Sequence, residues 1–261
     1  EVKVSASKGT LVEGSLESML EGKGVVLRSA ASGEISANNP IELSFDFEKD
    51  HDSVAMEGMV VASPKGSENG IAEGYVLIVY EENGQELTGV GEFPIQEGLR
   101  AVSARGYKKN FPVKLENGSM VIDFSGLIAV KKVTLFVTKT SNTSNLAEIS
   151  RVEFLNDMES RIPEPEMNIP KNITVTPANK MFTLQWDKEA NVTSYEISIT
   201  VGEDIEYRRT TATTLTVQQF KNDKLENGTE YIVRVQSVNG EWKSGFSDAI
   251  KAVPKVDKVP P

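Results

Sequence analysis

Short stretches of alternating or β-branched hydrophobic residues recur along the first part of the chain. The clearest are IELSFDF, VAMEGMVVA, GYVLIVY, MVIDF, KKVTLFVTK and ISRVEFL. Turn-forming pairs such as Asn83-Gly84 and Asn117-Gly118 separate them, and an alternation with a period of two is typical of half-buried strands. The best helical candidate is GSLESMLEG, at most two turns long. The pattern therefore predicts an all-β fold.

A proline-rich stretch then interrupts this alternating pattern. RIPEPEMNIPKN contains Pro163, Pro165 and Pro170, and this density of proline cannot sustain a helix or a central strand. We expect a linker at residues 161–169, between an N-terminal domain of residues 1–160 and a second domain of residues 170–254. Residues 255–261 would form a C-terminal tail.

The strand rhythm restarts after the linker, with about seven expected strands in roughly 85 residues, which fits a small β-sandwich. Trp186 lies in the second of these strands, Tyr195 begins the third, and Leu225 precedes Tyr231 by six residues. The Leu-to-Tyr spacing resembles the tyrosine corner of the fibronectin type III domain, and the resemblance covers residues 170 to 254. It implies an immunoglobulin-like β-sandwich that usually serves as a spacer or protein-contact module.

The order of segments in the first domain carries a second resemblance. VVASPKGSENGIAEGYVLIVYEENG joins two central strands through a loop with Pro64-Lys65 and Asn69-Gly70, and LAEISRVEFL follows as a closing segment. Over roughly residues 2 to 157 this order resembles the discoidin-like domain, also called the coagulation factor five/eight type C domain, and in particular the family 32 carbohydrate-binding modules. The resemblance implies a galactose-binding-like jelly-roll β-sandwich that recognises glycans and is part of a bacterial surface protein.

Charge and composition exclude several classes of binding partner and site. The formal net charge is −10, so the phosphate backbone of a nucleic acid would be repelled, and we expect no nucleic-acid partner. No apolar run approaches the roughly 20 residues of a membrane helix, so we expect no membrane insertion. The absence of cysteine excludes disulfides and thiolate metal sites. The chain opens with EVKVSASKG, without a start Met or an apolar leader, and we expect a mature or trimmed form.

The residues required for common enzymatic sites are missing. His51 is the only histidine, so no two-histidine zinc site can be assembled, and nothing near His51 resembles a nucleophile elbow. Paired carboxylates such as Asp50 with Asp52 are abundant, but acids that flank β-turns in an acidic protein are usually solvated charges. We therefore expect that this chain is not an enzyme.

Sugar binding needs only one or two side chains that form forked hydrogen bonds to adjacent hydroxyls, and usually an aromatic face. Carried over from the family 32 modules, the carbohydrate-binding positions fall on Arg28, Lys65, Asn69 and Asn145. Asn69 keeps the family's residue, Lys65 replaces an arginine, and Arg28 replaces a histidine. The aromatic residue expected in the last loop is absent, where Asn145 stands instead.

Two aromatic residues from another segment, Tyr107 and Phe111 in ARGYKKNFPV, are alternatives for a stacking face. Packing in the core or at a sheet edge is the expected role for both. Their neighbours Arg105, Lys108 and Lys109 form the most concentrated positive patch of the chain, which we interpret as a solvated hairpin end rather than a contact for an acidic partner.

Discoidin-type modules often hold a structural Ca²⁺, and the resemblance places its candidate ligands at Glu21 and Glu148. Calcium takes six to eight oxygens, several of them from backbone carbonyls. Lys23 lies in the same loop as Glu21 and would oppose a divalent cation. We therefore keep a plain sandwich-edge role for Glu148 as the alternative.

Three functions remain open at this stage. The first is a non-catalytic extracellular carbohydrate-binding protein whose fibronectin-like domain is a spacer. The second is a protein-binding or adhesion protein of the cell surface without a sugar site. The third is an ancillary fragment of a larger glycosidase or metallopeptidase. We expect a monomer, located outside the cell or on its surface, with a glycan or a cell-surface glycoprotein as its partner.

Overall fold

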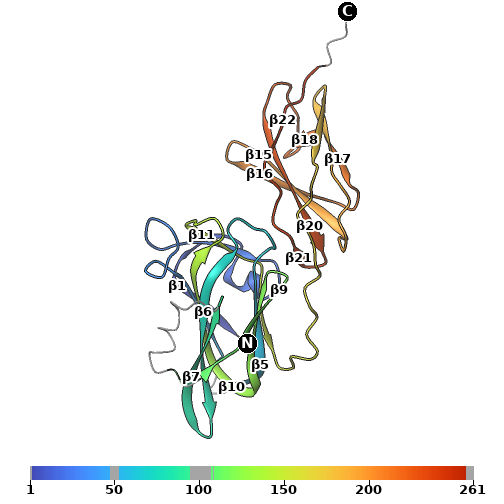
Figure 1. Ribbon diagram of the computed structural model, residues 1–261. Coiled ribbons are helices and arrows are strands. Elements are labelled where there is room, and N and C mark those ends of the chain that lie inside the picture. Colours follow the sequence, from blue (N-terminus) through green and yellow to red (C-terminus); the bar gives the residue numbers. More distant parts are fainter. Residues whose placement is uncertain (1, 48–52, 95–106, 108, 257–261) are drawn as a thin grey trace, which may run out of the picture. The chain divides into compact units, whose positions relative to one another are not determined.

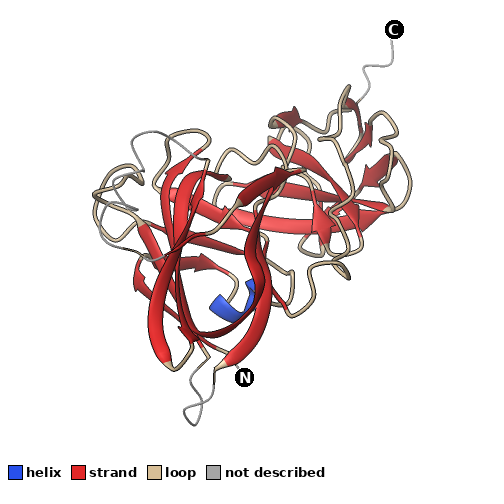
Figure 2. Ribbon diagram, turned by 60° about the horizontal axis from the view of Figure 1, so that its bottom comes forward, coloured by secondary structure: helices blue, strands red, loops and turns tan. Residues whose placement is uncertain are grey.

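The computed structural model describes residues 2–47, 53–94, 107 and 109–256. The chain divides into two compact units, Glu1–Glu164 and Pro165–Pro261, and the division falls inside the stretch predicted as a linker. Strands make up nearly all of the regular structure of both units (Figure 2). The prediction of an all-β fold is therefore confirmed for the described residues.

In the part of the N-terminal unit that the structure describes, there are twelve strands and one short 3-10 helix. Their bounds are β1 (Lys3–Lys8), β2 (Thr10–Glu13), η1 (Leu16–Met19), β3 (Val25–Arg28), β4 (Ile41–Asp46), β5 (Val54–Ala62), β6 (Ile71–Glu82), β7 (Gln85–Phe93), β8 (Lys109–Asn110), β9 (Val113–Glu116), β10 (Ser119–Thr140), β11 (Leu146–Ile149) and β12 (Arg151–Leu155). A nine-stranded sheet has the main path β1-β4-β10-β6-β7-β8, and a smaller sheet has the order β11-β3-β2. Figure 1 labels β1, β5, β6, β7, β9, β10 and β11 of this unit.

The 22-residue strand β10 organises the N-terminal unit. Its second half pairs with β4 and β6, so that Leu135 lies opposite Leu43 on one side and Val76 on the other. Its first half pairs with β5 and β9. Ser125 and Gly126, with φ of 59° and 124°, lie where the register with β5 shifts. The sequence pattern predicted two separate strands here, but the chain continues through this irregularity as one strand.

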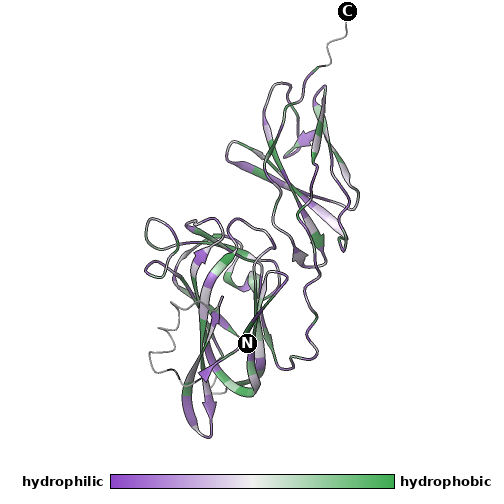
Figure 3. Ribbon diagram, viewed as in Figure 1, coloured by the Kyte–Doolittle hydropathy of each residue, from purple (hydrophilic) through white to green (hydrophobic). Residues whose placement is uncertain are grey.

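The main core of the N-terminal unit is a cluster of buried side chains from both of its sheets. Figure 3 shows apolar stretches along its strands and polar residues along many of the loops. Phe111 is 4% exposed, and its ring centroid lies 5.9 Å from that of Tyr80 and 5.1 Å from that of Phe124. The expected core role of Phe111 is therefore confirmed. Tyr107 is partly exposed, while Arg105 and Lys108 lie outside the described residues.

The C-terminal unit is a sandwich of two sheets, one with the order β13-β14-β17 and one with the order β16-β15-β20-β21, in which β22 also pairs with β20. The bounds are β13 (Thr174–Ala178), β14 (Met181–Gln185), β15 (Ser194–Val201), β16 (Asp204–Thr210), β17 (Thr214–Val217), β18 (Gln219–Phe220), β19 (Asp223–Lys224), β20 (Tyr231–Asn239), β21 (Trp242–Lys243) and β22 (Ile250–Ala252). The two-residue strands β18, β19 and β21 are too short for an alternating pattern to reveal.

The predicted tyrosine corner is present in this unit. The hydroxyl of Tyr231 accepts a hydrogen bond from the backbone amide of Glu226 at 3.3 Å, and Leu225 is buried beside it in the same core. Trp186 packs edge-on against Tyr195, with 5.3 Å between the ring centroids. These contacts form the two-sheet core that the spacing of aromatic residues predicted.

Candidate functional site

Three loops of the N-terminal unit meet beside β11 (Figure 1). They are the loops at residues 29–40, 63–70 and 141–145. The amide of Ile35 donates to the carbonyl of Ser144 at 2.9 Å, and the amide of Asn142 donates to the carbonyl of Glu68 at 3.0 Å. Backbone hydrogen bonds therefore join the last loop to each of the other two, and side chains far apart in the sequence share one surface.

The loop SPKGSENG owes its shape to local hydrogen bonds and to one serine. The amide of Ser67 donates to the carbonyl of Pro64 at 2.9 Å, and Gly66 adopts the positive φ of 75° that glycine tolerates best. The hydroxyl of Ser63 donates to the carbonyl of Glu148 at 2.8 Å and accepts from the amide of Ile71 at 2.9 Å. These contacts fix the loop against β11.

The three loops enclose an open hollow of about 610 Å³. Its lining residues are polar for the most part: Gly33, Glu34, Glu68, Asn69, Asn142, Thr143, Ser144, Asn145 and Leu146. Three carboxamides and two hydroxyls can each donate and accept hydrogen bonds, and two carboxylates can accept them. An array of this kind is suited to a ligand that presents several adjacent hydroxyl or amine groups.

Two of the four residues predicted to bind carbohydrate, Asn69 and Asn145, line this hollow. The backbone carbonyl of Asn145 accepts from the amide of Ser29 at 2.9 Å, and that of Asn69 accepts from the amide of Glu148 at 2.8 Å. Their main chains are therefore held in place, and both residues belong to the lining of the hollow. None of the described lining residues is aromatic, as the sequence also indicated for the last loop.

The other two predicted residues, Arg28 and Lys65, are not among the lining residues. Arg28 is exposed at the end of β3, opposite Leu146 in the small sheet. Lys65 lies close to the β9–β10 turn. A Cβ atom added at Gly118 in that turn would lie 3.7 Å from the Cα of Lys65. The hollow instead includes Glu34 and Glu68, which no local sequence pattern singled out.

The two candidate calcium ligands have partners within the protein. The ammonium group of Lys23 lies 2.5 Å from a carboxylate oxygen of Glu21, and the hydroxyl of Ser67 donates to the carboxylate of Glu148. Among the residues that the structure describes, no group of three or more His, Asp or Glu side chains could hold a metal ion. A calcium site at these two residues therefore stays a prediction without a described cluster of acidic ligands, and His51 lies outside the described residues.

A buried carboxyl group lies at the end of the N-terminal unit, in the stretch predicted as a linker. Glu164 is 5% exposed, and its carboxylate accepts a hydrogen bond from the hydroxyl of Ser119. Burial raises the pKa of Glu164 to about 7, although the Ser119 hydrogen bond and the charges of Arg151 and Lys65 act in the opposite direction. Glu116 adds to the rise. The side-chain amide of Asn117 also donates to the Glu164 carbonyl at 3.0 Å.

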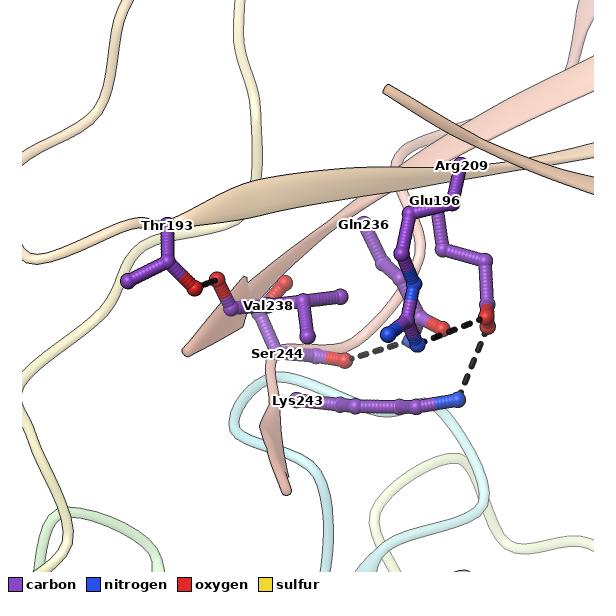
Figure 4. Close-up of polar contacts among 7 residues, drawn as sticks. All are labelled: Thr193, Glu196, Arg209, Gln236, Val238, Lys243 and Ser244. Carbon is purple, nitrogen blue, oxygen red and sulfur yellow. Dashed lines mark hydrogen bonds and ion pairs between the residues drawn. The ribbon is translucent and has the colours of Figure 1, made fainter. Parts of the chain in front are cut away.

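Acidic and basic side chains in the C-terminal unit form a cross-strand cluster. Glu196 on β15 lies 3.3 Å from Arg209 on β16 and 2.9 Å from Lys243 on β21 (Figure 4). Nearby, the side-chain amide of Gln236 donates to the carbonyl of Ser244 at 2.9 Å. These two ion pairs tie together β15, β16 and β21 of one sheet.

Comparisons with known proteins identify the class of the C-terminal unit. Residues 168–253 match the family model of the fibronectin type III domain. No curated protein matches the chain. No helix within the described ranges is long and apolar enough to cross a membrane.

Several solved structures resemble part of the chain. The fibronectin type III domain of the human collagen alpha-1(XX) chain is 21% identical, covers 39% of this chain and 97% of its own, with a TM-score of 0.30. A fibronectin type III domain of human contactin 1 is 18% identical and covers 40% of this chain and 97% of its own, with a TM-score of 0.30. The FN5 domain of Drosophila Lar is 17% identical and covers 34% of this chain and 97% of its own, with a TM-score of 0.29. The match to the family model shows that residues 168–253 form a fibronectin type III domain, a class commonly used as a spacer or protein-interaction module.

Proposed function

We propose that the N-terminal unit binds a glycan in the hollow between the loops at 29–40, 63–70 and 141–145. The observation that carries the proposal is that Asn69 and Asn145, from loops more than 70 residues apart in the sequence, line one open hollow. Carboxamides form paired hydrogen bonds with adjacent hydroxyls, which is how protein sites commonly orient a sugar ring. The volume of about 610 Å³ would accept one to two sugar rings.

The lining also supports a modest affinity. Without an aromatic face, the site would lack the stacking contact that supplies much of the apolar burial of a sugar ring. Each neutral hydrogen bond contributes only about 0.5 to 1.5 kcal/mol, so we expect dissociation constants in the range of about 0.1 to 1 mM for a single site. Such a protein would depend on repeated copies or on neighbouring domains for tight attachment.

The rest of the proposal follows the sequence resemblance. The N-terminal unit would be a discoidin-like, non-catalytic carbohydrate-binding domain of a bacterial extracellular or surface protein, monomeric, with the fibronectin type III domain as its spacer. The contacts to sugar are assigned first to Asn69 and Asn145. Arg28 and Lys65, which lie outside the lining, are assigned a lesser contribution.

Titration calorimetry with a panel of neutral, acidic and amino oligosaccharides tests this proposal. For any glycan that binds, Asn69→Ala and Asn145→Ala should each weaken the affinity by several-fold to about tenfold, because each removes a hydrogen-bonding amide. Asn38→Ala is a matched control, since Asn38 is exposed in the 29–40 loop but does not line the hollow. Binding that survives both lining substitutions would reject this site, and failure of the whole panel would reject glycan recognition.

A further inference from the structure

The two units differ strongly in charge. Residues 1–164 contain 25 acidic and 16 basic residues, whereas residues 165–261 contain 13 and 12. The negative charge of the chain is therefore concentrated in the unit that contains the hollow. A field of this sign raises the local concentration of cations and repels anions at any site on that unit.

The charged side chains that line the hollow are also negative. Glu34 and Glu68 belong to it, and none of its described lining residues is Lys, Arg or His. Asn142 lies beside Glu68 in the wall, because its backbone amide donates to the Glu68 carbonyl at 3.0 Å. Its side-chain amide also lies 3.5 Å from the Glu68 carboxylate. On the other side, the carbonyl of Glu34 accepts from the side-chain amide of Asn39 at 3.1 Å, which holds the Glu34 main chain in its loop.

From this arrangement we propose that the hollow selects glycans that carry a free amino group, in the ammonium form. The inference rests on the proposed function, since it names the substrate class of the same site. Amides and hydroxyls would bind the sugar hydroxyls, while the carboxylates of Glu34 and Glu68 would bind the ammonium group. The N-acetylated form of the same sugar would lose this contact, because an acetamide carries no charge. Acidic glycans would be excluded by repulsion.

The test compares glucosamine oligomers with N-acetylglucosamine oligomers of equal length, by titration calorimetry at low salt and again at 0.5 M NaCl. We expect the amino form to bind more tightly by about fivefold or more, with a smaller preference at high salt, as for partly exposed ion pairs. Glu68→Gln and Glu34→Gln should each reduce the preference by up to about fivefold. Glu17→Gln is the matched control, because it removes one exposed carboxylate of the same unit outside the hollow.

The outcomes separate this inference from the proposed function. If both oligomers bind equally and Asn145→Ala still weakens their binding, the amine preference is wrong and glycan binding stands. If no oligomer or other glycan binds, the proposed function itself fails. If Glu17→Gln weakens binding as much as Glu68→Gln, the attraction is due to overall charge and the site is wrong. A lysine-rich peptide that binds more tightly than the amino sugar and is displaced from the hollow would reassign the site to protein.

Discussion

Replacing Glu164 with glutamine tests whether ionisation of this buried carboxyl group destabilises the N-terminal unit. The carboxyl group is 5% exposed and accepts a hydrogen bond from Ser119. Glutamine has nearly the same shape, and its carbonyl oxygen can accept the same hydrogen bond, but it cannot ionise. The substitution therefore removes the titration of this group while keeping its packing.

The magnitude follows from the pKa of Glu164, which burial raises from 4.5 to about 7. At about 1.4 kcal/mol per pKa unit, ionising this group costs the folded state about 3 kcal/mol more than the unfolded state. Because the folded state holds the proton more tightly, stability from this group is fully present below pH 4.5 and falls as the pH rises toward 7. Between pH 5 and pH 8 the native chain should lose about 2 to 3 kcal/mol that Glu164→Gln retains.

Urea denaturation at pH 5 and pH 8 measures this difference, with circular dichroism reporting on both units. Both tryptophans, Trp186 and Trp242, belong to the C-terminal unit, so their fluorescence provides an internal reference that Glu164→Gln should leave unchanged. Glu159→Gln is the control for an exposed carboxyl group nearby. An equal loss of stability between the two pH values in the native chain and in Glu164→Gln would refute the reasoning.

Two packing predictions complete the set. Gly89→Ala should destabilise the N-terminal unit by about 1 to 3 kcal/mol, because the new Cβ would lie 2.2 Å from a ring carbon of Phe111; an unchanged urea midpoint would contradict this. Tyr231→Phe should cost the C-terminal unit about 1 kcal/mol, because it removes the hydroxyl that accepts from the Glu226 amide. Tryptophan fluorescence during denaturation measures that cost, and a midpoint equal to that of the native chain would show that the hydroxyl is dispensable.

The alternating pattern located β4, β5, β6, β10 and β12 of the N-terminal unit, because each of these strands buries one face against a core. It missed the continuity of β10, since Ser125 and Gly126 interrupt the alternation although backbone pairing resumes at Ile128. It also divided the closing segment differently: ISRVEFL was treated as one run, whereas β11 ends at Ile149 and β12 begins at Arg151. Breaks in a pattern do not reveal whether the ladder of hydrogen bonds continues.

The candidate site was less predictable than the fold. Asn69 and Asn145 came from a resemblance to a family, and the hollow contains both of them. Glu34 and Glu68 could not be found in this way, because they come together only through hydrogen bonds between loops distant in sequence. Glu164 was missed for a different reason: a Pro-rich stretch with acidic residues normally indicates exposure, and the pattern does not reveal the contacts of Glu164 with Ser119 and Asn117.

The pairing of β5 has a consequence for the synthesis of the chain. Its neighbours in the sheet are β10 and β12, both of which follow it in the sequence. A nascent chain that has emerged only as far as residue 118 therefore carries β5 with two unpaired edges, although Met59 and Val61 on this strand are completely buried in the finished protein. Exposed apolar edges of this kind promote aggregation. The N-terminal unit can close only after residue 155 has been made, and fragments that end earlier are expected to be insoluble.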